Sequence, residues 1–197
     1  MRKMTSESHP ISSAEEVLEA ILALPETERA RLLDLMAREP SLAQYVILPE
    51  ARQLAFDLPA EFEGVPDYAI VFDGGSEGNP GRGYGSYAVI SRGGRQQVHR
   101  LDFETVVTNN EAEYDTLIAA LEGVCERIES VGKDPSDFTV EVRGDSNLVL
   151  RQVGGTWKAK DERMRRRRNL VRSLLARFGG CRLVEQPRGE SVRVLGH

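Results

Sequence analysis

Apolar residues near the start of the chain recur every three or four positions, which predicts two consecutive helices. The apolar side of the first comprises Val17, Leu18, Ile21 and Leu24. Ser12 or Ser13 is suited to cap its start, and Pro25 suits the first turn of the second helix. The apolar side of the second helix comprises Leu32, Leu33, Leu35 and Met36. The pattern therefore predicts a helical hairpin in residues 1–47.

Prolines separate this hairpin from the rest of the chain. Pro49, Pro59 and Pro66 fall within residues 48–66, where no helical or strand-like period continues. We interpret residues 48–66 as a linker between two regions of different composition.

Beyond residue 66 the pattern alternates between strand-like and helix-like segments. The expected strands cover residues 68–72, 86–92, 96–103, 138–142 and 181–184. The expected helices cover residues 110–131, a short segment from 146, and residues 161–178. A glycine-rich stretch that ends at Gly85 lies between the first two strands and outside both. This order predicts an α/β domain over residues 67–197, with a mixed five-stranded sheet flanked by helices.

The composition suits a folded protein of a reducing compartment. Hydrophobic residues make up 40% of the 197 residues, enough for a packed core. No apolar run approaches the roughly eighteen residues of a membrane span, and the first ten residues lack a secretory signal. Cys125 and Cys181 are the only cysteines and form no short pairing motif. We therefore expect a cytoplasmic protein without membrane partners.

The charge distribution changes what the net charge of -5 suggests about partners. Residues 1–64 hold 6 basic and 12 acidic residues, so the hairpin region is acidic. Residues 151–177 hold 10 basic and 2 acidic residues. Because salt screens each charge within about 8–10 Å, such a basic stretch can bind phosphate locally on an acidic protein.

Glu113 is the first candidate for chemistry, because it shares a helix face with apolar residues. That apolar stripe comprises Leu117, Ala120, Leu121 and Val124. A carboxylate directed at a core must find a partner or lose its charge. The alternative is a solvated glutamate at the helix start, where the helix dipole favours it.

Two aspartates occupy comparable positions near strand ends. Asp73 follows the first buried strand, and Asp145 lies where the fourth strand gives way to a helix. Each has a structural alternative, as a turn residue before glycines and as a helix cap respectively. Together with Glu113 they can converge on one side of a sheet, where their mutual repulsion requires a cation. Oxygen-only ligands favour Mg²⁺ or Mn²⁺, and two such ions about 4 Å apart support phosphodiester hydrolysis.

Three motifs in the same order resemble those of type 1 ribonuclease H. They are the opening segment 68–81, which runs Tyr-Ala-Ile-Val-Phe-Asp-Gly-Gly-Ser-Glu-Gly-Asn-Pro-Gly, the segment 108–114, and the segment 142–147. The resemblance covers about residues 67–197. It implies cleavage of the RNA strand of RNA–DNA hybrids with two Mg²⁺ or Mn²⁺ ions. It also implies that Asp73, Glu113 rather than Glu111, and Asp145 are the catalytic and metal-binding carboxylates.

The resemblance also assigns polar neighbours to the substrate. The residues expected to contact the hybrid are Gly75, Ser76, Asn79, Asn110 and Asn147. Amides can donate to and accept from the ribose 2′-hydroxyls that distinguish RNA from DNA. The alternative for the asparagines is a role in turns and helix caps.

An arginine-rich segment supplies candidate phosphate contacts. Of the arginines between 163 and 168 only two or three can face one side of a helix, and we expect Arg165 and Arg166 to engage a DNA backbone. The alternative is a solvated helix face. Trp157, just before them, resembles the tryptophan of this loop in the family.

The C-terminal motif departs from the family. Where a fourth carboxylate is usual, the ungapped register places Leu195, and Ser191 stands where an asparagine is usual. Either Glu190 or His197 takes over the ligand role, or the site is degraded, and a frayed, exposed terminus is the structural alternative. We expect reduced activity or a preference for Mn²⁺.

The competing functional interpretation is a nucleic-acid-binding protein on a ribonuclease H scaffold with little or no catalysis. The acidic hairpin does not resemble a hybrid-binding domain, and its leucine-rich faces suggest protein contacts or self-association.

Overall fold

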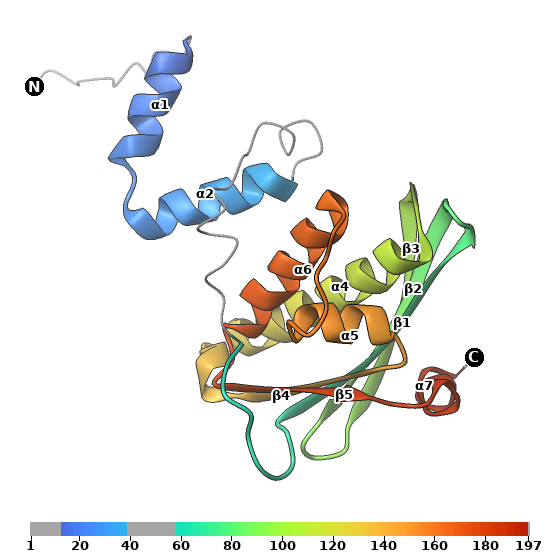
Figure 1. Cartoon of the computed structure of the whole chain (residues 1–197). Helices are drawn as coiled ribbons and strands as arrows, with labels where there is room; N and C mark the ends of the chain where they lie inside the picture. Colours follow the sequence, from blue (N-terminus) through green and yellow to red (C-terminus); the bar gives the residue numbers. More distant parts are fainter. Residues whose placement is uncertain (1–12, 39–57, 197) are drawn as a thin grey trace, which may run out of the picture. The chain divides into compact units, whose positions relative to one another are not determined.

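A computed structural model describes residues 13–38 and 58–196 (Figure 1). The chain divides into two compact units, residues 1–50 and 51–197, and each is described by itself. Within the described residues, no helix combines the length and the apolar character needed to cross a membrane.

The first unit contains two helices, as expected from the apolar period. They are α1 (Ala14–Ala23) and α2 (Glu26–Arg38). Ser13 caps α1, because its hydroxyl accepts a hydrogen bond from the backbone of Glu16 at 3.2 Å. Arg29 donates to the carbonyl of Leu24 at 3.0 Å, which fixes the turn between the helices. The apolar side chains of Val17, Leu18, Leu22 and Leu35 are exposed, and a protein partner for them stays a prediction.

The second unit is built on the mixed five-stranded sheet that the sequence predicts. Its strands are β1 (Tyr68–Gly78), β2 (Gly81–Ser91), β3 (Gln96–Val107), β4 (Thr139–Gly144) and β5 (Gly180–Glu185). The strand order is β3-β2-β1-β4-β5. The first three strands pair antiparallel, whereas β4 and β5 run parallel to β1. β1 is therefore the central strand, antiparallel to β2 on one side and parallel to β4 on the other.

Helices pack on both faces of this sheet. The large core lies between the sheet and α4 (Asn109–Ser130), α5 (Asn147–Val153) and α6 (Glu162–Leu175) (Figure 1). A short turn, η1 (Pro135–Asp137), precedes β4, and α7 (Arg188–Leu195) ends the described chain. Because strand side chains alternate, Ile70 and Phe72 join the large core, while Val71 packs with Leu195 of α7 on the other face.

Both cysteines contribute to the large core. Cys125 and Cys181 are free and buried, and burial raises the pKa of each thiol to about 11. They therefore stay protonated near neutral pH and act as small apolar side chains.

The glycine-rich stretch after Asp73 is strand, which corrects the sequence interpretation. β1 and β2 continue through it as a ladder in which Gly74 lies opposite Gly85. A Cβ on Gly74 would lie 2.6 Å from backbone atoms of Ala112 and Glu113, and one on Gly85 would lie 2.0 Å from the Thr116 hydroxyl. These glycines therefore allow α4 to approach the sheet closely. They also make the sequence look less like a strand, which is why the sequence interpretation ended the first strand too early.

The described part of the predicted linker is packed against β5. Cys181 donates its backbone N–H to the carbonyl of Ala60 at 3.3 Å. Arg182 donates to the carbonyl of Phe62 at 3.2 Å, and its guanidinium lies 4.6 Å from the centre of that ring. Residues 58–66 thus pack along β5, at the edge of the sheet, and do not form a free linker. An uncovered edge strand would expose unpaired backbone groups.

Candidate active site

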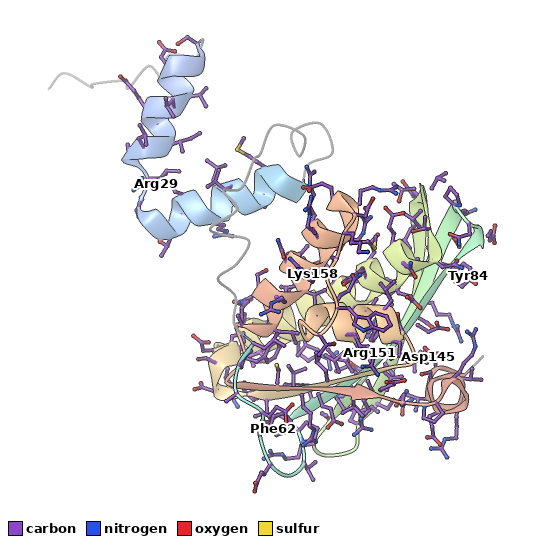
Figure 2. The ribbon with its side chains drawn as sticks, in the orientation of Figure 1. Arg29, Phe62, Tyr84, Asp145, Arg151 and Lys158 are labelled. Carbon is purple, nitrogen blue, oxygen red and sulfur yellow. The ribbon has the colours of Figure 1, made fainter. Side chains whose placement is uncertain are left out.

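Asp73, Glu113 and Asp145 come from three neighbouring elements. β1 and β4 pair in parallel up to Val71 opposite Arg143, and each aspartate lies two residues beyond that pair. Asp145 sits between the end of β4 and the start of α5 (Figure 2). The contact of Gly74 with the backbone of α4 brings Glu113 to the same place.

Glu111 has a structural role that leaves Glu113 as the site glutamate of this helix. Glu111 accepts hydrogen bonds from the backbone and hydroxyl of Thr108 at 2.9 and 2.8 Å, while its own N–H donates back to that hydroxyl at 3.3 Å. This capping box fixes the start of α4. The other carboxylate oxygen of Glu111 pairs with Arg163 and Arg167, each at 3.3 Å.

The carboxylate of Glu113 is partly buried and surrounded by other acids. Ser146 donates its hydroxyl to Glu113 Oε2 at 2.5 Å. The pKa of Glu113 is raised from 4.5 to about 7: burial is the largest cause, Asp145 and Asp73 add to the rise, and Ser146 and Arg188 oppose it. Glu113 therefore changes charge close to neutral pH, and its protonation depends on the charges of Asp73 and Asp145.

Replacing Glu113 with Gln should stabilise the metal-free protein at pH 8 but not at pH 4. The folded state holds the Glu113 proton up to about pH 7, whereas the unfolded chain releases it near 4.5. Stability therefore falls as pH rises through that window, by up to about 3 kcal/mol. Urea unfolding at the two pH values, without divalent ions, measures the difference. An equal effect of Glu113→Gln at both pH values would contradict the raised pKa.

The oxygen donors of Asp73, Glu113 and Asp145 suit a hard divalent cation, although the three carboxylates are too far apart to bind one as they stand. Among residues 13–38 and 58–196, no three His, Cys, Asp or Glu side chains are close enough to hold a metal ion. The three carboxylates nevertheless offer only oxygen. Burial and the neighbouring acids raise the pKa of Glu113, and a bound cation would relieve the repulsion among the acids. A bound ion would have to draw the side chains inward.

An asparagine that the sequence interpretation missed joins β1 to α4. Asn109 Oδ1 accepts from the backbone N–H and hydroxyl of Ser76 at 2.9 and 2.8 Å. The N–H of Asn109 donates to Asn79 Oδ1 at 3.2 Å. Asn110, which was expected at the substrate, is exposed beside it. The doubled asparagine in the second motif was the available signal, but sequence alone does not say which of the two, both exposed, bonds to Ser76 and Asn79.

Asn147 is held by neighbours on the protein. Its Oδ1 accepts from Arg151 Nε at 2.8 Å, and its amide nitrogen donates to Glu185. Arg151 also lies 5.5 Å from the centre of the half-exposed Trp157 ring (Figure 2). A contact between Asn147 and the hybrid stays a prediction. Such a contact would have to replace the bonds of Asn147 to Arg151 and Glu185.

The arginines of α6 divide between solvent and α4. Arg165 and Arg166 both pair with Glu162 on their own helix; Arg166 is exposed, whereas Arg165 is half-buried. Arg167 instead turns toward α4 and holds the carboxylate of Asp115 with two bonds, at 2.7 and 3.0 Å. Of the two expected phosphate contacts, Arg166 thus faces solvent and Arg165 only in part, while Arg167 ties α6 to the helix that carries Glu113.

Replacing Arg167 with Ala should lower the free energy of unfolding by roughly 2 kcal/mol, because it leaves Asp115 and the buried Glu111 without their shared partner. Arg166→Ala is the matched control on the same helix, and we expect a change below about 0.5 kcal/mol for that exposed pair. Chemical denaturation compares the two. Equal losses would mean that the pairing across the helices is not what stabilises α6.

The C-terminal segment is an ordered helix, so the expectation of a frayed terminus is wrong for the described residues. Leu195 is 1% exposed and packs with Val71 and Ala88. Ser191 is buried and accepts a hydrogen bond from Gln186 at 2.9 Å. An apolar side chain at position 195 explains the docking, since it fills the second core on the far face of the sheet.

Neither substitute for the fourth carboxylate gains support. Glu190 is exposed and pairs with Arg193 one turn along α7. It forms no cluster with the other acids within the described part of the chain. His197, the other candidate ligand, lies outside the described residues.

A mixed sheet of order β3-β2-β1-β4-β5, with carboxylates on β1, after β4 and near the start of α4, defines the ribonuclease H class of fold. No family model matches the chain. A curated ribonuclease HI from Halobacterium salinarum is 38% identical over 122 residues, 62% of this chain. The solved structure of the RNase H1 from that archaeon is 35% identical, with a TM-score of 0.53, over 64% of this chain and 90% of its own. The chain belongs to the ribonuclease HI family.

A second solved structure adds a ligand to the comparison. A ribonuclease H1 isolated from compost by a metagenomic approach was solved in complex with an RNA/DNA hybrid. It is 29% identical over 64% of this chain and 90% of its own, with a TM-score of 0.57. The present chain spans 57% of the length of the curated Halobacterium relative.

Proposed function

We propose that this protein is an endoribonuclease that hydrolyses the RNA strand of RNA–DNA hybrids with the help of divalent metal ions. The observation that carries the proposal is the convergence of Asp73, Glu113 and Asp145, which the parallel pairing of β1 with β4 and the contact of Gly74 with α4 bring together. Burial raises the pKa of Glu113, and Asp145 and Asp73 add to that rise. Membership of the ribonuclease HI family and a related structure with an RNA/DNA hybrid support the substrate.

The three carboxylates would hold Mg²⁺ or Mn²⁺, two ions in the full site. When bound, such ions activate water and stabilise the leaving oxygen of a phosphodiester. The protein itself contributes orientation: Ser146 fixes the carboxylate of Glu113, and Asn109 bonds to Ser76 near the end of β1 and to Asn79 in the turn that follows. Gly75, Asn110 and Asn147, with Arg165 and Arg166, complete the proposed contacts with the hybrid.

A second candidate function is hybrid binding with little cleavage. Two observations favour it: Leu195 occupies the position of the usual fourth carboxylate and is buried in a separate core, and the described carboxylates form no ready metal cluster. Three carboxylates still suffice for one ion, so the first candidate keeps at least one metal position.

A cleavage assay separates the two candidates. A labelled RNA–DNA hybrid is incubated with the protein in Mg²⁺ or Mn²⁺, beside single-stranded RNA, duplex RNA and duplex DNA. We expect cleavage of the RNA in the hybrid alone, faster in Mn²⁺. Glu113→Gln and Asp145→Asn should each lower it at least about 100-fold, whereas Glu190→Gln, an exposed acid paired within α7, should leave it unchanged.

Each outcome of this assay decides a claim. Hybrid binding without cleavage in either metal would favour the second candidate. Cleavage that survives Asp145→Asn would remove that residue from the mechanism, and equal cleavage of duplex RNA would overturn the assignment of the substrate.

A further inference from the structure

A hollow beside Asp73 lies on the face of the sheet that α7 covers. It has a volume of about 350 Å³ and is lined by Asp73, Tyr84, Gly85, Ser86, Arg100 and Leu101. Asp73, Ser86 and Arg100 are directly in register across β1, β2 and β3, so their side chains share one face. The hollow therefore places one cationic side chain next to a proposed catalytic carboxylate.

The last turn of α7 orients Arg100. Its Nη2 donates to the carbonyl of Leu195 at 3.3 Å and to that of Gly196 at 3.4 Å. Terminal carbonyls of a helix lack partners within the helix and carry its negative pole, so they suit a guanidinium. Leu195 anchors this helix end against Val71 and Ala88. The residue that stands in place of the usual carboxylate thus also fixes a cation beside the site.

A second hollow continues from the first along the same sheet face. It has a volume of about 290 Å³, and it shares Tyr84 and Leu101 with the first hollow. Tyr84 is 51% exposed and lies opposite Gly75 in the ladder of β1 and β2, where a Cβ on Gly75 would lie 2.7 Å from the tyrosine hydroxyl. Arg82 lies at the far end and pairs with Asp102. The two hollows form a track with a guanidinium at each end and an aromatic ring between them. Three carboxylates, Asp73, Glu77 and Asp102, also line it, and Asp102 already pairs with Arg82, so Arg100 is the cation that the track offers beside Asp73.

We propose that this track, from Arg100 past Tyr84 to Arg82, binds the backbone of the RNA strand, and that Arg100 contacts a phosphate next to the cleavage site. Cationic side chains interspersed with aromatic rings follow a nucleic-acid strand in this way. The inference rests on the proposed function, because Asp73 marks the place of cleavage. Where the site has lost one carboxylate and binds metal less strongly, Arg100 supplies part of the positive charge that the phosphates require.

The charge of Arg100 should affect the affinities for the hybrid and for a divalent cation in opposite directions. A guanidinium attracts phosphate but repels a divalent cation at the neighbouring carboxylates. Removing it should weaken hybrid binding and tighten metal binding. A residue that only supported the fold would not move the two affinities in opposite directions.

The test compares Arg100→Ala with Arg193→Ala, which removes an equal charge from an exposed position of α7 that does not line either hollow. Fluorescence anisotropy with a labelled hybrid in EDTA measures binding without cleavage. We expect Arg100→Ala to weaken binding about 10-fold and to reduce the salt dependence by about one charge. Mn²⁺ titration by calorimetry should show about threefold tighter binding. Arg193→Ala should change neither by more than about twofold.

Leu195→Ala controls for an indirect effect through α7. It loosens the helix that holds Arg100 but keeps the charge, so it should leave the salt dependence unchanged. If Leu195→Ala reproduces the whole effect of Arg100→Ala, or if Arg100→Ala leaves the affinity and the salt dependence as they were, the track is not a binding site. If the wild-type protein cleaves the hybrid and one of these two results is found, the track is excluded while the proposed function stands. A wild-type protein that binds no hybrid would overturn the proposed function as well.

Discussion

Leu195→Asp, which restores the carboxylate usual in the family, should destabilise the protein and should not increase cleavage. Leu195 is 1% exposed and its neighbours are Val71 and Ala88. An aspartate there loses the apolar packing and buries a charge without a partner, together worth roughly 4 kcal/mol. Because α7 is short, the expected result is its release from the sheet, with the loss of the Arg100 contacts to Leu195 and Gly196.

Urea unfolding and hybrid cleavage of Leu195→Asp measure the two halves of this expectation. Leu195→Met is the matched control, since a substitution that conserves volume should cost less than about 1.5 kcal/mol. At low pH a neutral aspartic acid should reduce part of the loss. Faster cleavage with unchanged stability would show instead that position 195 can turn toward the carboxylates.

Gly74→Ala should both destabilise the protein and disable the site. The added Cβ would lie 2.6 Å from the carbonyl carbon and oxygen of Ala112 and from the amide nitrogen of Glu113. All three atoms are backbone, so no rotamer change relieves the contact, and β1 or α4 must move. We expect a loss of about 3 kcal/mol in unfolding free energy. A displacement of about 1 Å between Asp73 and Glu113 should also lower cleavage about 100-fold.

Gly93→Ala provides the control for Gly74→Ala. Gly93 lies in the connection between β2 and β3, and a Cβ there meets nothing within 4 Å. Its stability should change by less than about 0.5 kcal/mol, and its cleavage should not change. Denaturation and cleavage assays on both variants suffice. A Gly74→Ala protein as stable and active as Gly93→Ala would show that the close approach of β1 and α4 is not required.

Local patterns predicted the order of elements, because a helix or strand buries side chains at a period set by its own geometry. The five strands and the helices 110–131 and 161–178 were found on this basis, with bounds that shifted by a few residues at most positions. The larger error was at β1 and β2, where glycine suggested a break in the strands. Glycine is unfavourable in a strand by itself, and only the contact with α4 accounts for it there.

The candidate site was partly within reach of the sequence. Asp73, Glu113 and Asp145 stand in motifs that resemble those of ribonuclease H, and the departure at Leu195 was visible in the same way. The motifs did not show which residues these side chains and their neighbours bond to in the folded protein. Asn109 joining Ser76, and Arg167 joining Asp115, depend on residues 33 and 52 positions apart in the chain.

The sequence by itself thus determined the family, and it predicted the three carboxylates and the departure at position 195, because these follow from residue identities at short spacing. The tertiary structure alone decided which glycines admit α4, which arginine of α6 turns inward, and that Leu195 anchors α7 while its carbonyl orients Arg100. The physical reason is the same in each case. Burial, charge pairing and close backbone approach are properties of surfaces that meet only when distant segments fold together.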